Sequence, residues 1–560
     1  MAFIHWPSRS SPPYSSSKGI ANARREREDP PNSIRPSALS LPNRSAPPAL
    51  PGRARELLAF SVAFARRHAL FLGLLASGVA LRVVTLVAYQ PALLIYDSQS
   101  YLVDALHLRP PAARPLGYSF FLWMLDTRHE LAAVPAVQHL MGLAIAGLIY
   151  ALLLRLGVRR WAAALAAAPI LLDAYQLIFE QYVLSEALFE LFLIAGCAAL
   201  LWQRRPGIVA AGVAGLMFAA TTLTRANGMV VVLPALLALV CLHWTASPAW
   251  ARSDGWIGAR LMPRGRAVVG ALRPALPAAA ALLIAFATPV VAYAVWFHKL
   301  HGAYATTGFG GRFYYARVAP FVDCSKFSVP ANERALCPAE PVGKRPSLGG
   351  STVEYYTWST KSPIYRIDPR SRARLASDFA KRAVRHQPLD YLRAVTHDFF
   401  RGFALTRTTQ RGELSIERWR FPLSYPTYLA NTAAIIKRHG GGRGRVDRDL
   451  AGFLRDYQRF GFVPGPVLAI GLIAALLAAL GLGRARRSGL RSASFLFAAT
   501  GVVLFASTVA ANQFTWRYQL VLLLLLPPAA ALGLTALLRK PAARTDRAAG
   551  DLAVPEGPSG

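Results

Sequence analysis

Long apolar runs, separated by short polar segments, dominate the pattern of this chain. A run of about 20 apolar residues is long enough to cross the hydrocarbon core of a bilayer as a helix. The pattern therefore predicts an all-α, polytopic membrane protein with about ten transmembrane helices, or up to about 11 to 13, together with interfacial helices. One or two further short helices are expected within 91–126, near the interface. The apolar runs lie near residues 70–89, 131–154, 161–178, 184–202, 207–223, 228–246, 276–297, 464–483, 492–511 and 517–538.

Positive charge predicts how these helices are oriented. Basic residues collect in the cytoplasmic loops of membrane proteins. With a cytoplasmic N-terminus, the short outer turns hold only Arg225 and Arg517, whereas the inner loops are rich in arginine. We therefore predict a multi-pass protein of the cell (plasma or inner) membrane with both termini in the cytoplasm. The inner arginines are Arg155, Arg159, Arg160, Arg204, Arg205, Arg252, Arg260, Arg264, Arg266, Arg273, Arg484, Arg486, Arg487 and Arg491.

The same pattern divides the chain into five segments. Polar ends without an apolar period predict tails, and a polar stretch too long for a connector predicts a folded outer loop. The segments are a disordered basic cytoplasmic tail (1–60), a transmembrane module (61–300) whose first outer loop spans 90–130, a large extracytoplasmic loop (301–463), the last transmembrane helices (464–538) and a second disordered cytoplasmic tail (539–560).

Composition changes the list of expected partners. Only 16% of the 560 residues are charged and 54% are hydrophobic, which is typical of a membrane protein rather than a soluble one. The net charge is +34, from 63 basic and 29 acidic residues. Because the basic residues are divided among membrane loops and tails, we expect them to face anionic lipid headgroups, and we expect no nucleic acid partner.

Two of the four cysteines lie in the large outer loop. Cys324 and Cys337 stand thirteen residues apart, and an oxidising compartment would let them form a disulfide. Two free thiols are the alternative. No histidine or second cysteine pair stands nearby at metal-binding spacing, so the sequence predicts no zinc site.

Asp97 is the strongest candidate for chemistry. It follows the first apolar run, on the predicted outer side, and Asp104 comes seven residues later. Seven residues are close to two helical turns, so a helix through this segment would point both carboxylates the same way. An acid just outside the first span favours chemistry at the membrane surface over passage through the membrane.

Further polar residues gather at the predicted outer ends of later spans. Glu180 and Glu186 supply acids, and Arg225 and Arg517 supply cations. Polar groups at this depth are costly unless they are paired or functional. Structural roles remain open: Glu186 could brace a helix end, and the two arginines could reach toward headgroups.

Two other polar residues of the spans have a structural interpretation. Asp173 lies in the third apolar run and is expected to act as a hydrogen-bonding partner rather than a catalyst. Arg82 lies within the first run, where we expect it to pair with an internal acid or to reach the outer interface.

Four short segments, in this order and on one side of the membrane, carry a resemblance to a known superfamily. The segments are Tyr96-Asp97-Ser98, Arg114-Pro115-Leu116-Gly117-Tyr118, Leu184-Ser185-Glu186-Ala187-Leu188-Phe189 and Thr224-Arg225-Ala226-Asn227-Gly228. With these segments the chain is similar to the polytopic GT-C glycosyltransferases, which include protein O-mannosyltransferases and the aminoarabinose transferase of lipid A. The resemblance covers roughly residues 65–300.

The resemblance implies a function. It implies transfer of a sugar from a polyprenyl-phosphate donor to a hydroxyl of an extracytoplasmic glycan, lipid or protein, with Asp97 as general base and Asp104 or Glu186 as a second acid. The donor phosphate would bind Arg225 and Arg517, because guanidinium groups pair well with phosphate. The expected substrate-binding residues are Tyr96, Tyr101, Arg114, Tyr118 and Glu180.

One departure from the family pattern bears on cofactors. Many GT-C enzymes place a second acid directly after the first, and here that position is Ser98. This departure weakens any expectation of a divalent metal, so the sequence predicts no cofactor.

Two other classes compete with the transferase. A multi-pass transporter or lipid flippase would favour polar residues near mid-bilayer and repeated halves. This chain places its acids at outer ends and shows no repeated halves. A non-catalytic scaffold of GT-C shape is the third alternative, and it would tolerate replacement of Asp97.

Overall fold

The computed structural model describes residues 52–245, 273–429 and 431–539. The chain divides into two units, Met1–Ala63 and Phe64–Gly560. The first unit is described only from Gly52 onward, where it is helical, so a helix begins inside the segment predicted to be a disordered tail. The remainder of that tail, the inner arginines of 252–266 and the segment 540–560 lie outside the described residues.

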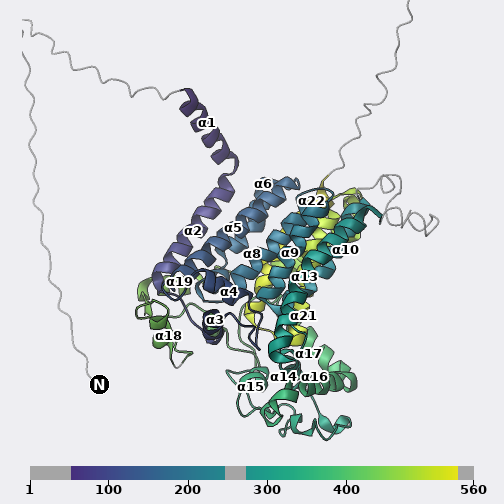
Figure 1. Ribbon diagram of the computed structural model, residues 1–560. Helices are drawn as coiled ribbons and strands as arrows, with labels where there is room; N and C mark the ends of the chain where they lie inside the picture. The colour runs from purple at the N-terminus through teal and green to yellow at the C-terminus, as the bar shows by residue number, and fades with distance from the viewer. Residues whose placement is uncertain (1–51, 246–272, 430, 540–560) are drawn as a thin grey trace, which may run out of the picture. The chain divides into compact units, whose positions relative to one another are not determined.

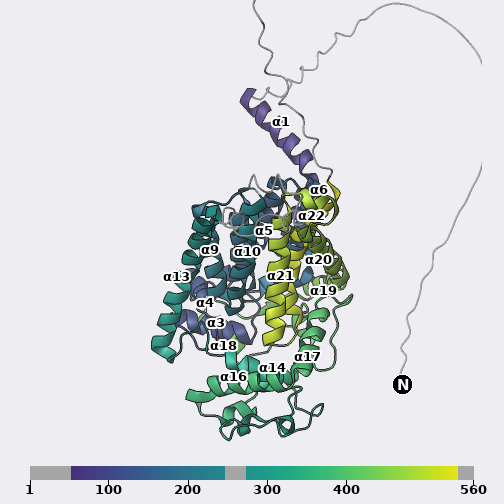
Figure 2. The same ribbon diagram turned by 90° about the vertical axis from the view of Figure 1, so that its right-hand side faces the viewer.

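The described chain is mostly helical, and its only named strands are two residues long each. Figures 1 and 2 show the long helices of the second unit running side by side, with shorter helices gathered at one end. The helices are α1 (Gly52–Arg67), α2 (Ala69–Ala88), α3 (Tyr96–His107), α4 (Gly117–Met124), α5 (Ala133–Arg155), α6 (Arg160–Leu172), α7 (Ala174–Gln181), α8 (Glu186–Leu201), α9 (Ile208–Thr224), α10 (Val232–Thr245), α13 (Leu276–His301), α14 (Gly310–Val318), α15 (Thr352–Trp358), α16 (Pro369–His386), α17 (Pro388–Arg401), α18 (Thr432–Arg438), α19 (Arg448–Tyr457), α20 (Gly465–Leu480), α21 (Arg491–Ala511) and α22 (Leu520–Leu538); the strands are β1 (Tyr89–Gln90) and β2 (Arg445–Val446).

Among the residues that the structure describes, six helical segments are long and apolar enough to cross a membrane. The helices α9 and α20 are apolar but shorter. This finding supports the membrane class, while the predicted count of about ten spans stays a prediction. The six segments are Ala69–Ala88, Ala133–Arg155, Ala226–Trp244, Arg273–His301, Arg491–Ala511 and Trp516–Leu538.

The third predicted span, 161–178, is wrong as a single helix. The structure divides it into α6 and α7, which are bent by 47° at Asp173. Pro169 lies in the last turn of α6, and Asp173 caps α7 by accepting a hydrogen bond from the backbone N–H of Tyr175. A capping aspartate favours a new helix start over helix continuation. Counted as one broken span, this pair raises the number of candidate spans to seven.

The helical bundle has two chemically different ends. At one end lie α3, α4 and the long connection between α13 and α20, together with the starts of α8 and α22. At the other end, the described turns between helices carry arginines and contain no acidic residue. The apolar core fills the bundle between these ends and is continuous through α5, α6, α8, α9 and α22. The predicted site residues lie at the first end.

The connection between α13 and α20 has its own small core. Residues of α14, α15 and α16 pack together around Tyr315, Tyr356 and Phe379, and the structure joins Cys324 to Cys337 in a disulfide beside this core. The short β1–β2 pair then links the end of α2 to the start of α19. These contacts place the long connection beside the first outer loop.

Candidate functional site

Five charged side chains from four parts of the chain meet at the first end of the bundle. Arg517 donates from Nη1 to Oδ2 of Asp97 at 2.6 Å and from Nε to Oε1 of Glu186. Arg114 donates to Oδ1 of Asp97, and Arg225 donates to Oε1 of Glu186. We call these residues, Asp97, Arg114, Glu186, Arg225 and Arg517, the arginine–acid cluster. The structure thus brings together five of the predicted site residues, whereas the predicted acids Asp104 and Glu180 lie outside this cluster.

The arginine–acid cluster carries an excess of positive charge. Three guanidinium groups face two carboxylates, which leaves one positive charge uncompensated. Asp97 lies in the first turn of α3 and Glu186 is the first residue of α8, so the positive ends of two helix dipoles add to this field. An anion entering the cluster would find a favourable potential.

Asp97 is held ionised by its neighbours. Burial alone would raise the pKa of this carboxyl, but the guanidinium groups of Arg114 and Arg517 outweigh that effect and hold the pKa well below the usual range. Both carboxylate oxygens accept hydrogen bonds from arginine. Asp97 is therefore a poor proton acceptor as long as both arginines stay on it. In contrast, Oε2 of Glu186 is buried and has no partner among the described residues.

Two glycines explain how the arginines reach the cluster. A side chain at Gly117 would meet the backbone of Leu223 at 2.5 Å, so only glycine lets α4 start against the end of α9. This contact brings the Arg114 segment beside Arg225. A Cβ atom at Gly228 would likewise meet the backbone nitrogen of Thr222 at 2.8 Å, where the turn after Arg225 folds back on α9. Close backbone packing therefore explains why glycine occupies positions 117 and 228.

Ser98, the residue directly after Asp97, has a structural role. It is fully buried, and its Oγ accepts a hydrogen bond from the backbone N–H of Ile95 at 3.0 Å. This bond caps the start of α3 and fixes the turn that carries Asp97.

The predicted aromatic residues divide into supporting and exposed groups. Tyr101 is buried, shares a 3.1 Å hydrogen bond with Ser185, and lies under the guanidinium of Arg114. Tyr118 is fully buried and donates to Gln138 at 2.7 Å, so it supports Tyr101 from behind. Tyr96 is exposed, with Arg418 over its ring.

Asp104 lies apart from the arginine–acid cluster. Its carboxylate is half-buried and forms no hydrogen bond or ion pair with any residue that the structure describes. Burial raises its pKa to about 6, against the lowering effect of Arg114 and His107. The helical spacing did place both acids on α3, but two turns separate them along the helix by roughly 10 Å.

Glu180 belongs to a different, fully buried group. Arg82 donates to both of its oxygens, at 2.9 and 2.8 Å, and His139 and Gln176 complete the contacts. The pair Arg82–Glu180 is only 2% and 1% exposed. The expectation that Arg82 pairs with an internal acid is confirmed, and the prediction of Glu180 as a substrate-binding residue is not supported by this position.

This buried pair gives a stability prediction. Glu180→Gln would leave the Arg82 guanidinium buried without its carboxylate, and removal of one partner from a buried pair costs about 3–5 kcal/mol. We expect a loss of that size in the free energy of unfolding of the purified protein, followed by fluorescence. Glu417→Gln is the matched control, because Glu417 is 54% exposed in its pairs with Arg420 and Arg455 and should cost about 0–1 kcal/mol. Equal losses in the two variants would contradict the structural role of Glu180.

Asp173 is likewise a structural acid. Arg407 of the long connection donates to both of its oxygens at 3.1 Å, and the side chains are 3% and 0% exposed. Oδ2 also accepts from the backbone N–H of Val463. Asp173 therefore fastens the long connection to the bend between α6 and α7, in agreement with the interpretation as a hydrogen-bonding partner.

One acid beside the arginine–acid cluster was not predicted from the sequence. Glu354 lies on α15, where Gln513 donates to its Oε1 at 3.2 Å. Burial raises the pKa of Glu354; Arg418 and Arg517 lower it, while the charge of Asp97 adds to the rise. A carboxyl whose pKa is raised is a better base near neutral pH than one whose pKa is lowered. The only sequence signal for Glu354 was its place in the large outer loop.

Within the described residues, no group of three or more His, Cys, Asp and Glu side chains is arranged to hold a metal ion. No protein-family model matches the chain, and comparison with curated proteins and with solved structures gives no significant match.

Proposed function

We propose that this protein is a membrane glycosyltransferase that moves a sugar from a polyprenyl-phosphate donor to a hydroxyl acceptor outside the cytoplasm. The observation that carries the proposal is the arginine–acid cluster. Three guanidinium groups and two carboxylates from separate segments converge at one end of an apolar helical bundle. This combination suits a substrate with a phosphate on an apolar tail, because the tail stays in the bilayer while the phosphate meets the arginines.

The negative charge that develops on the phosphate during transfer matches the excess positive charge of the arginine–acid cluster. The donor is a phosphodiester with one negative charge, and the departing polyprenyl phosphate carries a second. Arg225 and Arg517 would therefore bind the leaving group more strongly than the donor. Cations that gain interaction energy as the bond breaks raise turnover and not only binding.

The bonds and protons of the transfer balance without a cofactor. The acceptor oxygen bonds to the anomeric carbon of the sugar, and the bond from that carbon to the phosphate oxygen breaks with its electron pair. The acceptor hydroxyl loses its proton to a carboxylate. The phosphate leaves as a weak base, so no general acid is required.

Asp97 is the proposed base, with one condition set by the geometry. Its oxygens are engaged by Arg114 and Arg517. A donor phosphate that takes over Arg517 would release one oxygen of Asp97 and raise its basicity. Glu354 is the alternative base, because its pKa is raised without any substrate present.

The pH dependence of the rate distinguishes the two bases. A base works only when deprotonated, so the rate falls as the pH falls through its pKa. Because kcat/KM reports the free enzyme, Asp97 with its lowered pKa predicts no acid limb above pH of about 5. Glu354→Gln should then leave transfer within about tenfold of wild type. An acid limb that lies above the ordinary glutamate value of about 4.3 and vanishes in Glu354→Gln would assign the base to Glu354 instead.

We further propose that the site lies outside the cytoplasm, which rests on the arginine-rich described turns at the opposite end of the bundle. A single cysteine introduced at exposed Lys344 should react with an impermeant thiol reagent in intact cells, whereas one at exposed Gln203 should react only after lysis. Cys197 and Cys241 are replaced in both, and the disulfide is kept. The reverse labelling pattern would invert the proposed topology and place the site on the cytoplasmic face.

Loss of the gene tests the proposed function in cells. Mass spectrometry of a deletion strain should show a polyprenyl-phosphate sugar that accumulates and an envelope glycan that lacks the same sugar. Complementation with wild type should reverse both changes, and complementation with Asp97→Asn should reverse neither. Unchanged lipid-linked sugars and unchanged glycans would reject the transferase. Accumulation that Asp97→Asn corrects as well as wild type would favour a non-catalytic scaffold.

A further inference from the structure

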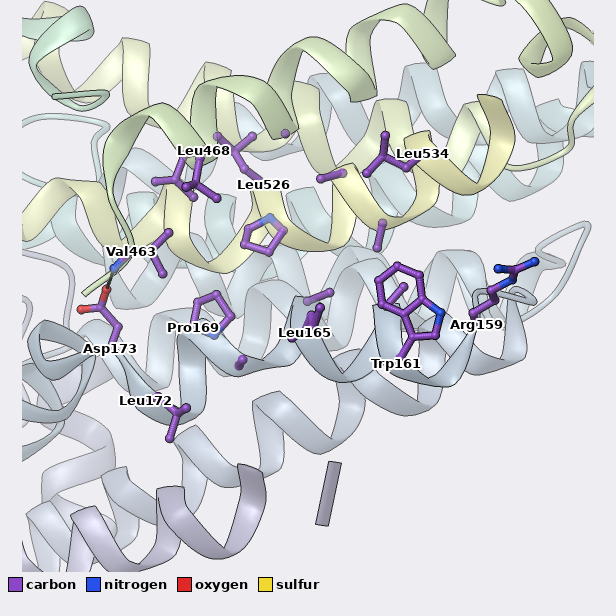
Figure 3. Close-up of a pocket in the computed structure, with 18 of the residues that line it drawn as sticks. Arg159, Trp161, Leu165, Pro169, Leu172, Asp173, Val463, Leu468, Leu526 and Leu534 are labelled. Atoms are coloured by element: carbon purple, nitrogen blue, oxygen red, sulfur yellow. Dashed lines mark hydrogen bonds between the residues drawn. The ribbon is translucent and has the colours of Figure 1, made fainter. Parts of the chain in front are cut away.

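An apolar groove runs along the bundle away from the arginine–acid cluster. It lies between α6, α20 and α22, and its volume is about 870 Å³. Figure 3 shows Asp173 and Arg159 at opposite ends of this groove, with leucine and proline side chains between them. From Trp161 to Leu172 the groove follows α6 for roughly 16 Å, which is about half of a 30 Å hydrocarbon core. The groove therefore has the length of one leaflet.

The Arg159 end of the groove is basic. Arg539 lines the same end, and a second cavity of about 920 Å³ adjoins the groove through Arg159 and Trp161. Arg66, Arg67 and Arg160 line that second cavity, and neither cavity has an acidic residue at this end among the residues described. None of these five arginines forms an ion pair with a described carboxylate.

The Asp173 end is closed to an anion. Asp173 is the one acid among the described residues lining the groove, and both of its oxygens are already engaged by Arg407. A phosphate at this end would meet a carboxylate and no free cation. Charge therefore fixes the direction of an occupant, with its anionic group at Arg159 and its apolar part toward Asp173.

From these observations we infer a binding site for an anionic phospholipid at the end of the bundle opposite Asp97. Arg159 and Arg160 hold the headgroup phosphate, and an acyl chain fills the groove past Leu165, Leu526 and Leu534. Basic pockets between transmembrane helices bind anionic headgroups in this way, and Trp161, which lines both cavities beside Arg159, is of the residue type that membrane interfaces favour. This lipid is distinct from the proposed sugar donor, whose phosphate must reach Arg225 and Arg517 at the other end.

The test measures lipid binding by the purified full-length protein, using native mass spectrometry with phosphatidylglycerol and phosphatidylcholine. The double variant R159Q/R160Q should bind phosphatidylglycerol roughly 25-fold more weakly, because each arginine near an anionic lipid contributes about a fivefold factor. The double variant R204Q/R205Q is the matched control: it removes the same charge from exposed positions at the same end, outside both cavities, and should bind like wild type. Phosphatidylcholine should bind weakly to all three proteins.

A second variant tests the contribution of the lipid's acyl chain to binding separately from that of its headgroup. Leu165→Trp fills the groove without a change of charge and should also weaken phosphatidylglycerol binding at least tenfold, while the melting temperature without added lipid stays at the wild-type value. Inorganic phosphate at millimolar concentration should not displace the lipid. Equal losses in the two arginine double variants, equal binding of phosphatidylcholine, or full displacement by inorganic phosphate would each overturn the site.

Discussion

Asp97→Asn is expected to lower sugar transfer by about 100- to 10,000-fold, the range typical for loss of a general base. The substitution removes the carboxylate but keeps the size of the side chain. It also raises the uncompensated positive charge of the arginine–acid cluster from one to two, since three guanidinium groups then face Glu186 alone. Binding of the donor phosphate should therefore stay the same or tighten. The loss should appear in kcat and not as a raised KM.

Asp104→Asn is the matched control for this prediction. Asp104 lies on the same helix, two turns further on, and its carboxylate contacts no described partner by hydrogen bond or ion pair. We expect transfer within about twofold of wild type, measured on purified proteins with equal expression and equal melting temperature. If Asp104→Asn loses transfer while Asp97→Asn keeps it, the base is misassigned although the enzyme class stands.

Arg517→Ala is expected to have an effect of similar size. Arg517 is the residue that contacts both carboxylates, and its side chain is 11% exposed. Removal of a group that stabilises developing charge typically costs about 100- to 1,000-fold in kcat. Steady-state kinetics should show this loss in kcat together with a raised KM for the donor, because the phosphate loses a partner in the ground state as well.

Lysine replacements refine this prediction. Arg517 uses two different nitrogens to reach Asp97 and Glu186, a geometry that a single ammonium does not reproduce. Among the described acids, the guanidinium of Arg225 pairs with Glu186 alone, through one nitrogen, and it lies over the ring of Phe189. Arg225→Lys should therefore keep more transfer than Arg517→Lys. The opposite order would show that Arg517 is not the bridging cation of the reaction.

Much of the arginine–acid cluster was predictable because hydrophobic runs fix where helices end. Asp97, Glu186, Arg225 and Arg517 each follow or precede an apolar run, and the alternation of sides assigns all four to one face of the membrane. Charged side chains at neighbouring helix ends lie close together and are excluded from the apolar core, so opposite charges there pair with each other. The same reasoning gave Arg82 an internal partner, because an arginine within a span is costly when unpaired.

The contacts that the sequence did not predict have a common physical origin, which is packing between segments far apart in the chain. Glu180 lies near the same outer corner as Glu186, yet α7 turns it inward toward Arg82 because Asp173 ends α6 and starts a bent helix. Arg407 and Glu354 come from the long connection, where no apolar period indicates which side chains face the bundle. Their positions depend on how that connection folds on its own core around Tyr315 and Phe379.

The most direct test of the account is transfer by the purified protein. Wild-type protein in lipid discs is incubated with lipid-linked sugars and glycan acceptors extracted from the source membranes, and mass spectrometry follows free polyprenyl phosphate. We predict that wild type releases polyprenyl phosphate together with a glycan that has gained one sugar, and that Asp97→Asn and Arg517→Ala release neither above background. Release that proceeds equally in wild type and both variants, or no release by wild type from any of the lipid-linked sugars present, would contradict the proposed glycosyltransferase.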